Sequence, residues 1–401
     1  MSEASAMLNI GERVIVDDTI ESIEVHPYLP YNNSFETNDE VRIAINRQDI
    51  IVYPHESYLL IEGKFEKDMQ IINNAMAFLF QDVRYELNGV EIDRTKNCGI
   101  TTTMKGLVSY GTDMEHSLES SSWNIGKHKV IVDKKNDFSY TVPLSHLLGF
   151  AEDYKKVIVN AKHELILNRA STNEHCATVA ADSTPIDVTI TRIVWRMPVV
   201  KVSDREKLRL MQYVENDIPI PIAFRTWELY EYPSLPAGVD EHVWSIKTST
   251  MLEKPRYVII GLQQERKTDK KKASCKFDHV NLQNCSVYLN SQCYPYDSFN
   301  TDFSKDFMAL QYNAYANFQR SYYGKPVPTP LMSINDYKVH GALVVIDTSR
   351  QPDTFNSGIV DIRVVMKFTK DTPTNVAAYC LILHDSMFEY SPLTGKVRKN
   401  N

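Results

Sequence analysis

Residues 58–63 read YLLIEG, and 199 residues later (257 − 58 = 199) residues 257–261 read YVIIG. A second pair follows in the same order, with YELNG at 85–89 and VYLNS at 287–291. The Leu-Asn dipeptides of this pair are 202 residues apart (289 − 87 = 202), and both spacings are close to half of the 401-residue chain. Two half-chains with the same strand and turn signals in the same order predict a duplicated β domain.

Both halves contain the alternating or short apolar runs of β-strands. Val41, Ile43 and Ile45 alternate with polar residues, which is the period-2 pattern of a half-buried strand. Asn88-Gly89 predicts a type I′ hairpin turn, because both central residues of that turn need positive φ. The strands expected in the first half are 41–45, 58–65, 77–80, 83–87, 90–93, 138–142, 157–167 and 186–195. Those expected in the second half are 223–232, 243–248, 257–263, 275–281, 287–289, 342–347, 359–368 and 376–384.

A short helix is expected to join the halves. Ser203 and Glu206 have the spacing of a capping box, and Leu208, Met211 and Val214 make a narrow apolar stripe. Two prolines, at 219 and 221, then stop the helix, because proline removes a backbone donor. The pattern divides the chain into an N-terminal arm (1–18), a first β domain (19–202), the linking helix (203–217) and a second β domain (218–401).

Further helical segments are expected within the two halves. One covers 101–110, and a short amphipathic piece covers 144–150. In the second half Ser304 is the predicted N-cap of a helix that carries Phe307, Leu310, Ala314 and Phe318 and stops at Gly324. Helices this short leave the fold class as all-β.

The composition excludes several classes of protein. The chain has 44 Lys and Arg against 51 Asp and Glu, a net charge of −7 at pH 7, so no general cationic field attracts nucleic acid or anionic lipid, and any genome contact must be local. No stretch reaches the roughly 18 consecutive apolar residues that a membrane-spanning helix needs, which predicts a soluble protein. Six cysteines without a signal-peptide core in residues 1–13 indicate free thiols in a reducing compartment.

The sequence contains no recognisable catalytic or metal-binding motif. A Walker loop and a Gly-x-Ser-x-Gly nucleophile elbow are absent. Cys275, Cys285 and Cys293 are too irregularly spaced for a zinc ribbon, and His163 lies inside an expected strand, where a packed or solvent-facing side chain is the simpler interpretation than a base. We therefore predict no enzyme, no catalytic, cofactor-binding or metal-binding residues, no cofactor and no small-molecule substrate.

Three other groups of residues have two interpretations each. The basic run Lys267, Lys270, Lys271 and Lys272 is either a solvated hairpin tip or a contact for nucleic acid or nuclear import. The tail residues Lys396, Arg398 and Lys399 are either frayed or in contact with anionic material inside a shell. The aromatic row is expected to be core and inter-domain packing rather than a base-stacking platform; it consists of Phe307, Tyr312, Tyr315, Phe318, Tyr322 and Tyr323.

The chain resembles the double jelly-roll major capsid proteins of the adenovirus and tectivirus lineage, most strongly in its second half, while the first half fits by the order of its elements. The similarity is closest to the double jelly-roll-like proteins of insect-associated DNA viruses and of virus-derived animal genes. The residues that carry it are 255–261, Asp278, His279, Leu289, Asn290, Ser291, Tyr294, Pro295, Tyr296, Phe307 and 312–323. The resemblance implies an all-β fold of two tandem eight-stranded antiparallel jelly rolls with short helices.

The same resemblance implies a structural role. Three subunits are expected to form a homotrimer with a pseudo-hexagonal outline, and the trimers to tile an icosahedral capsid by self-assembly in the virion. Assembly would take place in the host cytoplasm or nucleus. The loops 168–181 and 264–274 are candidates for the exterior. The termini are expected at the base, where penton, minor capsid proteins, an internal membrane or the genome are the partners.

Two other classes of function stay open at this point. A lectin-like double jelly roll would bind carbohydrate through acidic and aromatic loop residues at one end of a sandwich, and ligand-dependent melting would reveal it. A virus-derived gene kept by a host for another binding role would have the same sequence features as a working capsid gene.

Overall fold

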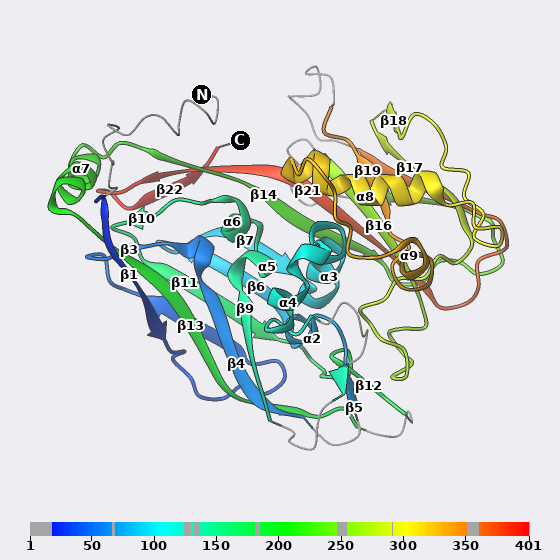
Figure 1. Cartoon of the computed structure of the whole chain (residues 1–401), viewed down its shortest axis with the longest axis horizontal. Helices are drawn as coiled ribbons and strands as arrows, with labels where there is room; N and C mark the ends of the chain where they lie inside the picture. Colours follow the sequence, from blue (N-terminus) through cyan, green and yellow to red (C-terminus); the bar gives the residue numbers. More distant parts are fainter. Residues whose placement is uncertain are drawn as a thin grey trace, which may run out of the picture.

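The computed structural model describes residues 18–65, 69–123, 130–131, 137–180, 185–246, 255–290, 292–350 and 361–400. All but the last residue of the predicted N-terminal arm, 1–18, lie outside these ranges. In Figure 1, α7 (Asp204–Glu215), the C-terminal strand β22 (Lys396–Lys399) and the start of β1 (Ile20–Tyr28) gather at one end of the molecule. The short strands β5 (Met69–Ile71) and β12 (Ala177–Val179) lie far from that end.

The first half is a sandwich of two antiparallel sheets. One sheet pairs its main strands in the order β1-β13-β4-β9, with β3 and β10 as additions, and the other in the order β2-β11-β6-β7. The bounds are Glu40–Ile45 for β2, Ile51–Val52 for β3, Tyr58–Phe65 for β4, Phe80–Leu87 for β6, Val90–Lys96 for β7, Asp137–Pro143 for β9, Ile158–Val159 for β10, His163–Arg169 for β11 and Val188–Val202 for β13. A small third sheet joins β5 with β8 (Val130–Ile131) and β12.

The second half repeats this strand order. Its sheets are β14-β21-β16-β19, with β22 added beside β21, and β15-β20-β17-β18, so the described part of each half has eight main strands in the same arrangement. The bounds are Ile220–Tyr232 for β14, Glu241–Ile246 for β15, Pro255–Gln264 for β16, Leu282–Leu289 for β17, Gln292–Tyr294 for β18, Val344–Asp347 for β19, Ile362–Phe368 for β20 and Val376–Ser391 for β21. The two YxxI runs that open the repeat are β4 and β16, which occupy the same position in their sheets. The predicted double jelly roll is confirmed.

Short helices fill the connections between strands. Their bounds are Ala75–Phe78 for α2, Cys98–Ser109 for α3, Glu115–Glu119 for α4, Leu144–Leu147 for α5, Gly149–Asp153 for α6, Ala309–Tyr323 for α8 and Ile334–His340 for α9, with 3-10 turns η1 (Pro54–Glu56) and η2 (Thr112–Met114). None of the helices in the described ranges combines the length and apolarity that would let it span a membrane. The helices predicted at 101–110 and 144–150 correspond to α3 and to α5 with α6.

Two hydrophobic cores hold the molecule together. The inner faces of the second jelly roll enclose one core, which includes Trp244, Val258 and Val364. The other core fills the first jelly roll and continues across the boundary onto the outer face of the sheet β14-β21-β16-β19, where Trp227 and Leu381 belong to it. That sheet is therefore buried on both faces. Because a continuous core joins the halves, the domain limits 19–202 and 218–401 stay a prediction.

Several strand limits differ from those predicted. The apolar run at 77–80 is divided between helix α2 and β6, since apolar runs this short fit a buried helix as well as a strand. The strand predicted at 157–167 is broken into β10 and β11 by Asn160, whose φ is 54°. The segment 275–281 contains no strand in the described structure; it ends in Val280 and Asn281 with φ of 45° and 55°, and β17 begins at Leu282.

Both predicted helix starts also need correction. Ser203 precedes α7, but its side chain makes no capping hydrogen bond, and only its carbonyl accepts one, from Lys207 N. The capping box is therefore wrong, although the helix is present. Helix α8 begins at Ala309 with Met308 as N-cap, because the Ser304 hydroxyl bonds to Asp302 instead. Gly324 ends α8 as predicted, in the left-handed conformation with φ of 68°.

Candidate functional site

A buried lysine lies where the two jelly rolls meet. Lys105, on α3 of the first half, is 3% exposed, and its Nζ lies 2.9 Å from Oε1 of Glu152 on α6. From the second half, the Tyr323 hydroxyl on α8 lies 2.6 Å from the same Nζ and also bonds to Glu152. The ammonium further packs 4.7 Å from the centre of the Trp227 ring. Burial lowers the pKa of Lys105 below its ordinary value, with the Glu152 charge opposing that shift.

An ion pair crosses this boundary directly. Arg225 on β14 donates to both carboxylate oxygens of Asp153 on α6, with distances of 2.7 Å from Nε and 2.6 Å from Nη2. Its Nη1 donates to the Tyr322 carbonyl, and the guanidinium carbon stands 3.6 Å from the centre of the Tyr322 ring. Burial opposes the charge, but the hydrogen bonds that Arg225 donates to Asp153 raise the pKa of Arg225 above its ordinary value. Two-bond Arg–carboxylate geometry of this kind fixes orientation as well as distance.

These contacts pack the two jelly rolls closely together at their boundary, which we call the joint. Gly149 at the start of α6 lies so close to β14 that an added Cβ would overlap the carbonyl oxygen of Arg225. The aromatic row of α8 packs into the joint, where the Tyr315 hydroxyl donates to the Leu107 carbonyl at 3.0 Å. The packing interpretation of the row is confirmed except at Phe307, which is 65% exposed.

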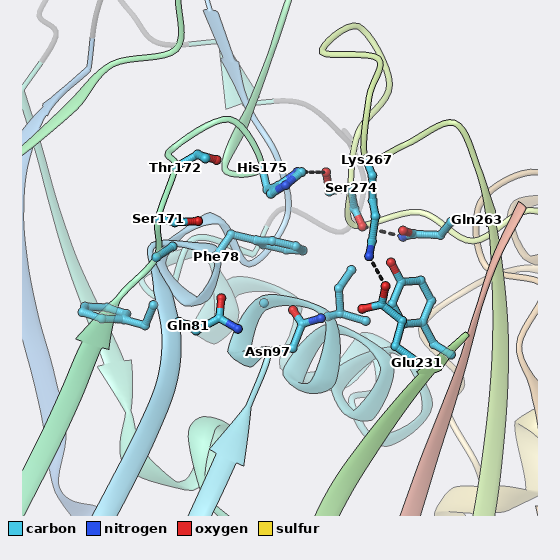
Figure 2. A pocket seen from close by; sticks show the side chains of 15 residues that line it. Phe78, Gln81, Asn97, Ser171, Thr172, His175, Glu231, Gln263, Lys267 and Ser274 are labelled. Carbon is cyan, nitrogen blue, oxygen red and sulfur yellow. Dashed lines mark hydrogen bonds and ion pairs between the residues drawn. The ribbon is translucent and has the colours of Figure 1, made fainter. Parts of the chain in front are cut away.

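A pocket of about 260 Å³ opens between the two halves, away from the end that holds α7. Figure 2 shows Gln81 and Asn97 of the first half on one side and the ion pair of Lys267 with Glu231 of the second half on the other. The residues that line it are Phe78, Phe80, Gln81, Asn97, Gly99, Ile100, Ala170, Ser171, Thr172, His175, Glu231, Gln263, Lys267, Ser274 and Tyr379.

The two loops predicted as exterior features meet at this pocket. His175 Nδ1 lies 3.2 Å from the Ser274 hydroxyl, and Lys270 pairs with Glu174 at 2.6 Å. A main-chain bond of 3.2 Å from Val179 N to the Lys270 carbonyl ties β12 to the second loop. One loop comes from each jelly roll, so the pair spans the boundary at this end of the molecule.

The basic run in the second of these loops is largely neutralised. Lys267 pairs with Glu231, Lys270 with Glu174, and Lys272 with Glu265 at 2.8 Å. The run does lie in the loop between β16 and β17, as predicted. Paired cations attract a phosphate backbone weakly, so the geometry favours the solvated loop over a nucleic-acid contact.

The end of the molecule with α7 exposes apolar side chains. Leu208 is 64% exposed and Met211 46%, and on the neighbouring strand β1 Ile20 is 50% exposed. Helix α7 has no buried residue. The tail at Lys396 is not frayed, because β22 pairs with β21, with Val397 opposite Tyr390.

His163 and five of the six cysteines, which were candidates for chemistry, are buried inside the fold. His163 is buried, lies 2.6 Å from the Tyr85 hydroxyl through Nδ1, and has its pKa lowered to about 3 by burial. This confirms the packed-strand interpretation. All six cysteines are free thiols, and five of them are buried, including Cys275 and Cys285. Within the described ranges, no three His, Cys, Asp or Glu side chains are grouped to hold a metal ion.

Sequence patterns alone did not reveal the joint or the pocket. The partners in the joint are 47 and 72 residues apart, and Tyr379 in the pocket is 298 residues from Gln81 (379 − 81 = 298). Spacing motifs report only residues that are close in sequence. The sequence did carry one signal for the joint, namely the apolar and aromatic content of the segment that forms α8.

The comparisons with known proteins agree with the fold described above. A family model described as the double jelly roll-like domain matches residues 69–388. No curated protein matches the sequence. A chain of the PBCV-1 virus capsid is similar in structure, with a TM-score of 0.64 and 12% identity over 97% of this chain and 99% of that chain.

Two further solved structures have a similar fold. The mavirus major capsid protein gives a TM-score of 0.57 at 10% identity and covers 98% of this chain and 92% of its own. The Faustovirus major capsid protein gives 0.59 at 8% identity and covers 95% and 92%. The likeness extends over both jelly rolls rather than one.

Proposed function

The chain belongs to the double jelly roll-like family, and from this membership we propose that it is a major capsid protein whose homotrimers tile an icosahedral viral shell. The observation that carries the proposal is the repeated strand order β1-β13-β4-β9 and β14-β21-β16-β19. Two similar sandwiches in one chain give a trimer six similar walls, and six similar walls suit a hexagonal lattice.

The joint supports this role. A tile must keep its two sandwiches at a fixed angle, because an error at each lateral contact would accumulate across a shell. The pair Arg225–Asp153 and the close approach at Gly149 hold α6 of the first half against β14 of the second. Lys105 on α3 contacts the second half through the Tyr323 hydroxyl and the Trp227 ring. Buried charge pairs with defined geometry favour one arrangement over its alternatives.

The exposed apolar residues supply a candidate contact surface. Leu208 and Met211 on α7 and Ile20 on β1 lie near both termini of the described chain. In the proposed shell this end is the base, where trimers meet one another and where penton, minor capsid proteins, membrane or genome are the further partners. The pocket end then faces outward.

The proposal implies a protein without enzymatic activity. A shell protein acts through its contact surfaces. The buried environments of His163 and of five of the six cysteines suit packing rather than catalysis. The location is the virion, after assembly in the host cytoplasm or nucleus. A virus-derived or lectin-like protein without a capsid role would share the fold but would not assemble.

Light scattering and negative-stain microscopy of the purified protein test the proposal. Three chains of 46.0 kDa give a trimer of about 138 kDa (3 × 46.0), and we expect this species or larger shells. Triangular or hexagonal particles in the images would agree with the pseudo-hexagonal outline. A strictly monomeric protein at high concentration, over several salt conditions, would contradict the capsid role.

A further inference from the structure

The pocket between the exterior loops contains a buried hydroxyl without a partner. Tyr379 lines the pocket and is fully buried, yet its hydroxyl has no hydrogen-bond partner in the described structure. Buried polar groups in native proteins nearly always have a partner, so an exception at a pocket indicates a group that is completed by something else. Lys267 Nζ lies 5.7 Å from the centre of the Tyr379 ring, and both residues line the pocket.

Other polar side chains around the pocket are also unengaged. Gln81, Asn97 and Ser171 make no side-chain hydrogen bond with the described part of the chain, whereas Gln263 is held by the Ser274 carbonyl at 2.7 Å. In Figure 2 the Gln81 and Asn97 side chains stand next to the open space. Amides and hydroxyls each offer donors and acceptors, which suits a ligand that has both on adjacent atoms.

The charge of the pocket is balanced. Its cation Lys267 pairs with its carboxylate Glu231, and burial keeps the pKa of His175 below its ordinary value. A neutral ligand therefore fits better than an anion or a cation. Phe78 and Phe80 add apolar surface at the wall, so the site combines apolar rings with dispersed polar groups.

We propose that this pocket binds a neutral sugar ring, as the terminal unit of a glycan. A sugar ring has adjacent hydroxyls for Gln81, Asn97 and Tyr379, and C–H faces for the aromatic wall. Small-molecule sites commonly combine an apolar lining with a few placed polar groups, and this pocket has both in about 260 Å³. The inference goes beyond the structural role, since it adds a binding function at the end of the molecule opposite α7.

Binding of methyl glycosides tests the site. The probes are the methyl glycosides of glucose, galactose, mannose and N-acetylglucosamine, measured by saturation-transfer NMR and by the rise in Tm. We expect at least one of them to bind the unmodified protein. Binding by none of the four would overturn the proposal.

Two variants assign the binding to this pocket. Tyr379→Phe removes a hydroxyl that has no protein partner, so folding is unaffected, and loss of one ligand bond should raise Kd by about threefold to tenfold. Ser171→Trp places an indole at the exposed rim and should abolish binding. Gln48→Trp, at an exposed turn elsewhere, is the matched control and should bind normally. Equal binding by all three variants would place the sugar at a different site.

Discussion

The Thr226 hydroxyl on β14 donates a 2.6 Å hydrogen bond to Oδ1 of Asp93 on β7, across the boundary between the jelly rolls. The second carboxylate oxygen accepts from Phe150 N at 2.9 Å. Asp93 is almost completely buried, and burial raises its pKa to about 6, above the ordinary value of 3.8. The joint therefore contains a carboxyl group that titrates near the pH of mildly acidic compartments.

We predict that the contribution of Asp93 to the free energy of unfolding falls as the pH rises from about 4 to about 6. Its folded pKa lies above its unfolded value, so the folded state holds the extra proton in that window and the contribution is lost as that proton leaves. The shift of about 2.2 pH units (6 − 3.8) corresponds to about 3 kcal/mol. Denaturant unfolding of the native protein and of Asp93→Asn over this pH range measures the difference.

The native protein must be compared with Asp93→Asn because buried histidines change the stability with pH in the opposite direction. Burial lowers the pKa of His146 to about 4 and that of His163 to about 3, so their contribution is lost as the pH falls below about 6.5. These residues are present in both proteins and cancel in the comparison. Equal pH slopes for the native protein and the variant would contradict the role of Asp93.

Replacing the buried lysine of the joint should be costly. Lys105→Met leaves the Glu152 carboxylate, which is 17% exposed, without its cation, and breaking a largely buried pair in this way costs about 3 kcal/mol in the free energy of unfolding. The matched control is Lys64→Met, since Lys64 pairs with Asp137 at 3.5 Å on the surface and such pairs contribute about 0–1 kcal/mol. Denaturant midpoints measure both. Equal effects of the two substitutions would show that the joint does not depend on the ion pair.

Adding one methyl group at Gly149 should strain the contact between the two halves and lower the stability of the protein. The new Cβ would overlap the main-chain oxygen of Arg225, and a backbone atom cannot rotate away as a side chain does. We expect Gly149→Ala to destabilise the protein more than Gly89→Ala, whose site has open space and only the strain of a positive φ, about 1 kcal/mol. Thermal unfolding compares them. A smaller effect at Gly149 would mean that the jelly rolls are free to move apart.

The exposed stripe of α7 should matter for assembly and not for folding. Leu208 is 64% exposed, so Leu208→Glu is expected to leave Tm within about 1 °C while lowering the fraction of assembled particles in light scattering. Leu208→Met keeps an apolar side chain and is the matched control. If both variants assemble like the native protein, the shell contacts lie on another surface.

Deletion of residues 1–18 tests the predicted arm. We expect the trimer to persist and shell formation to be impaired, because arms of this kind become ordered on assembly. Size-exclusion chromatography with light scattering separates these two outcomes. Loss of folding in the truncated chain would instead show that the arm belongs to the core.

The strand order was predictable because it depends on local patterns that occur twice. Residues 58–65 form β4, and Asn88 and Gly89 form the predicted turn, with φ of 50° and 78°. One limit failed where a side chain takes up backbone acceptors. Gln263 donates to the Ser274 and Lys276 carbonyls, next to the segment 275–281 that does not form a strand.

The candidate sites were not predictable for a different reason. Lys105 and Gln81 look like ordinary surface residues in the sequence, and their environments arise only when distant segments pack together. Lys105 meets Tyr323 from 218 residues away. A single sequence carries no signal for such pairs, whereas the repeat was visible because both copies have the same local form.

The core shared by the two jelly rolls also affects how the chain folds during translation. Leu107 on α3 and Phe150 on α6 belong to the same apolar cluster as Leu381 and Leu383 on β21. A ribosome releases the first half well before β21, which begins at Val376, so Leu107 and Phe150 lack the part of the cluster that β21 supplies until that strand has emerged. Nascent chains that expose apolar surface are prone to aggregation. Productive synthesis therefore favours chaperone protection of the first half until β21 has emerged.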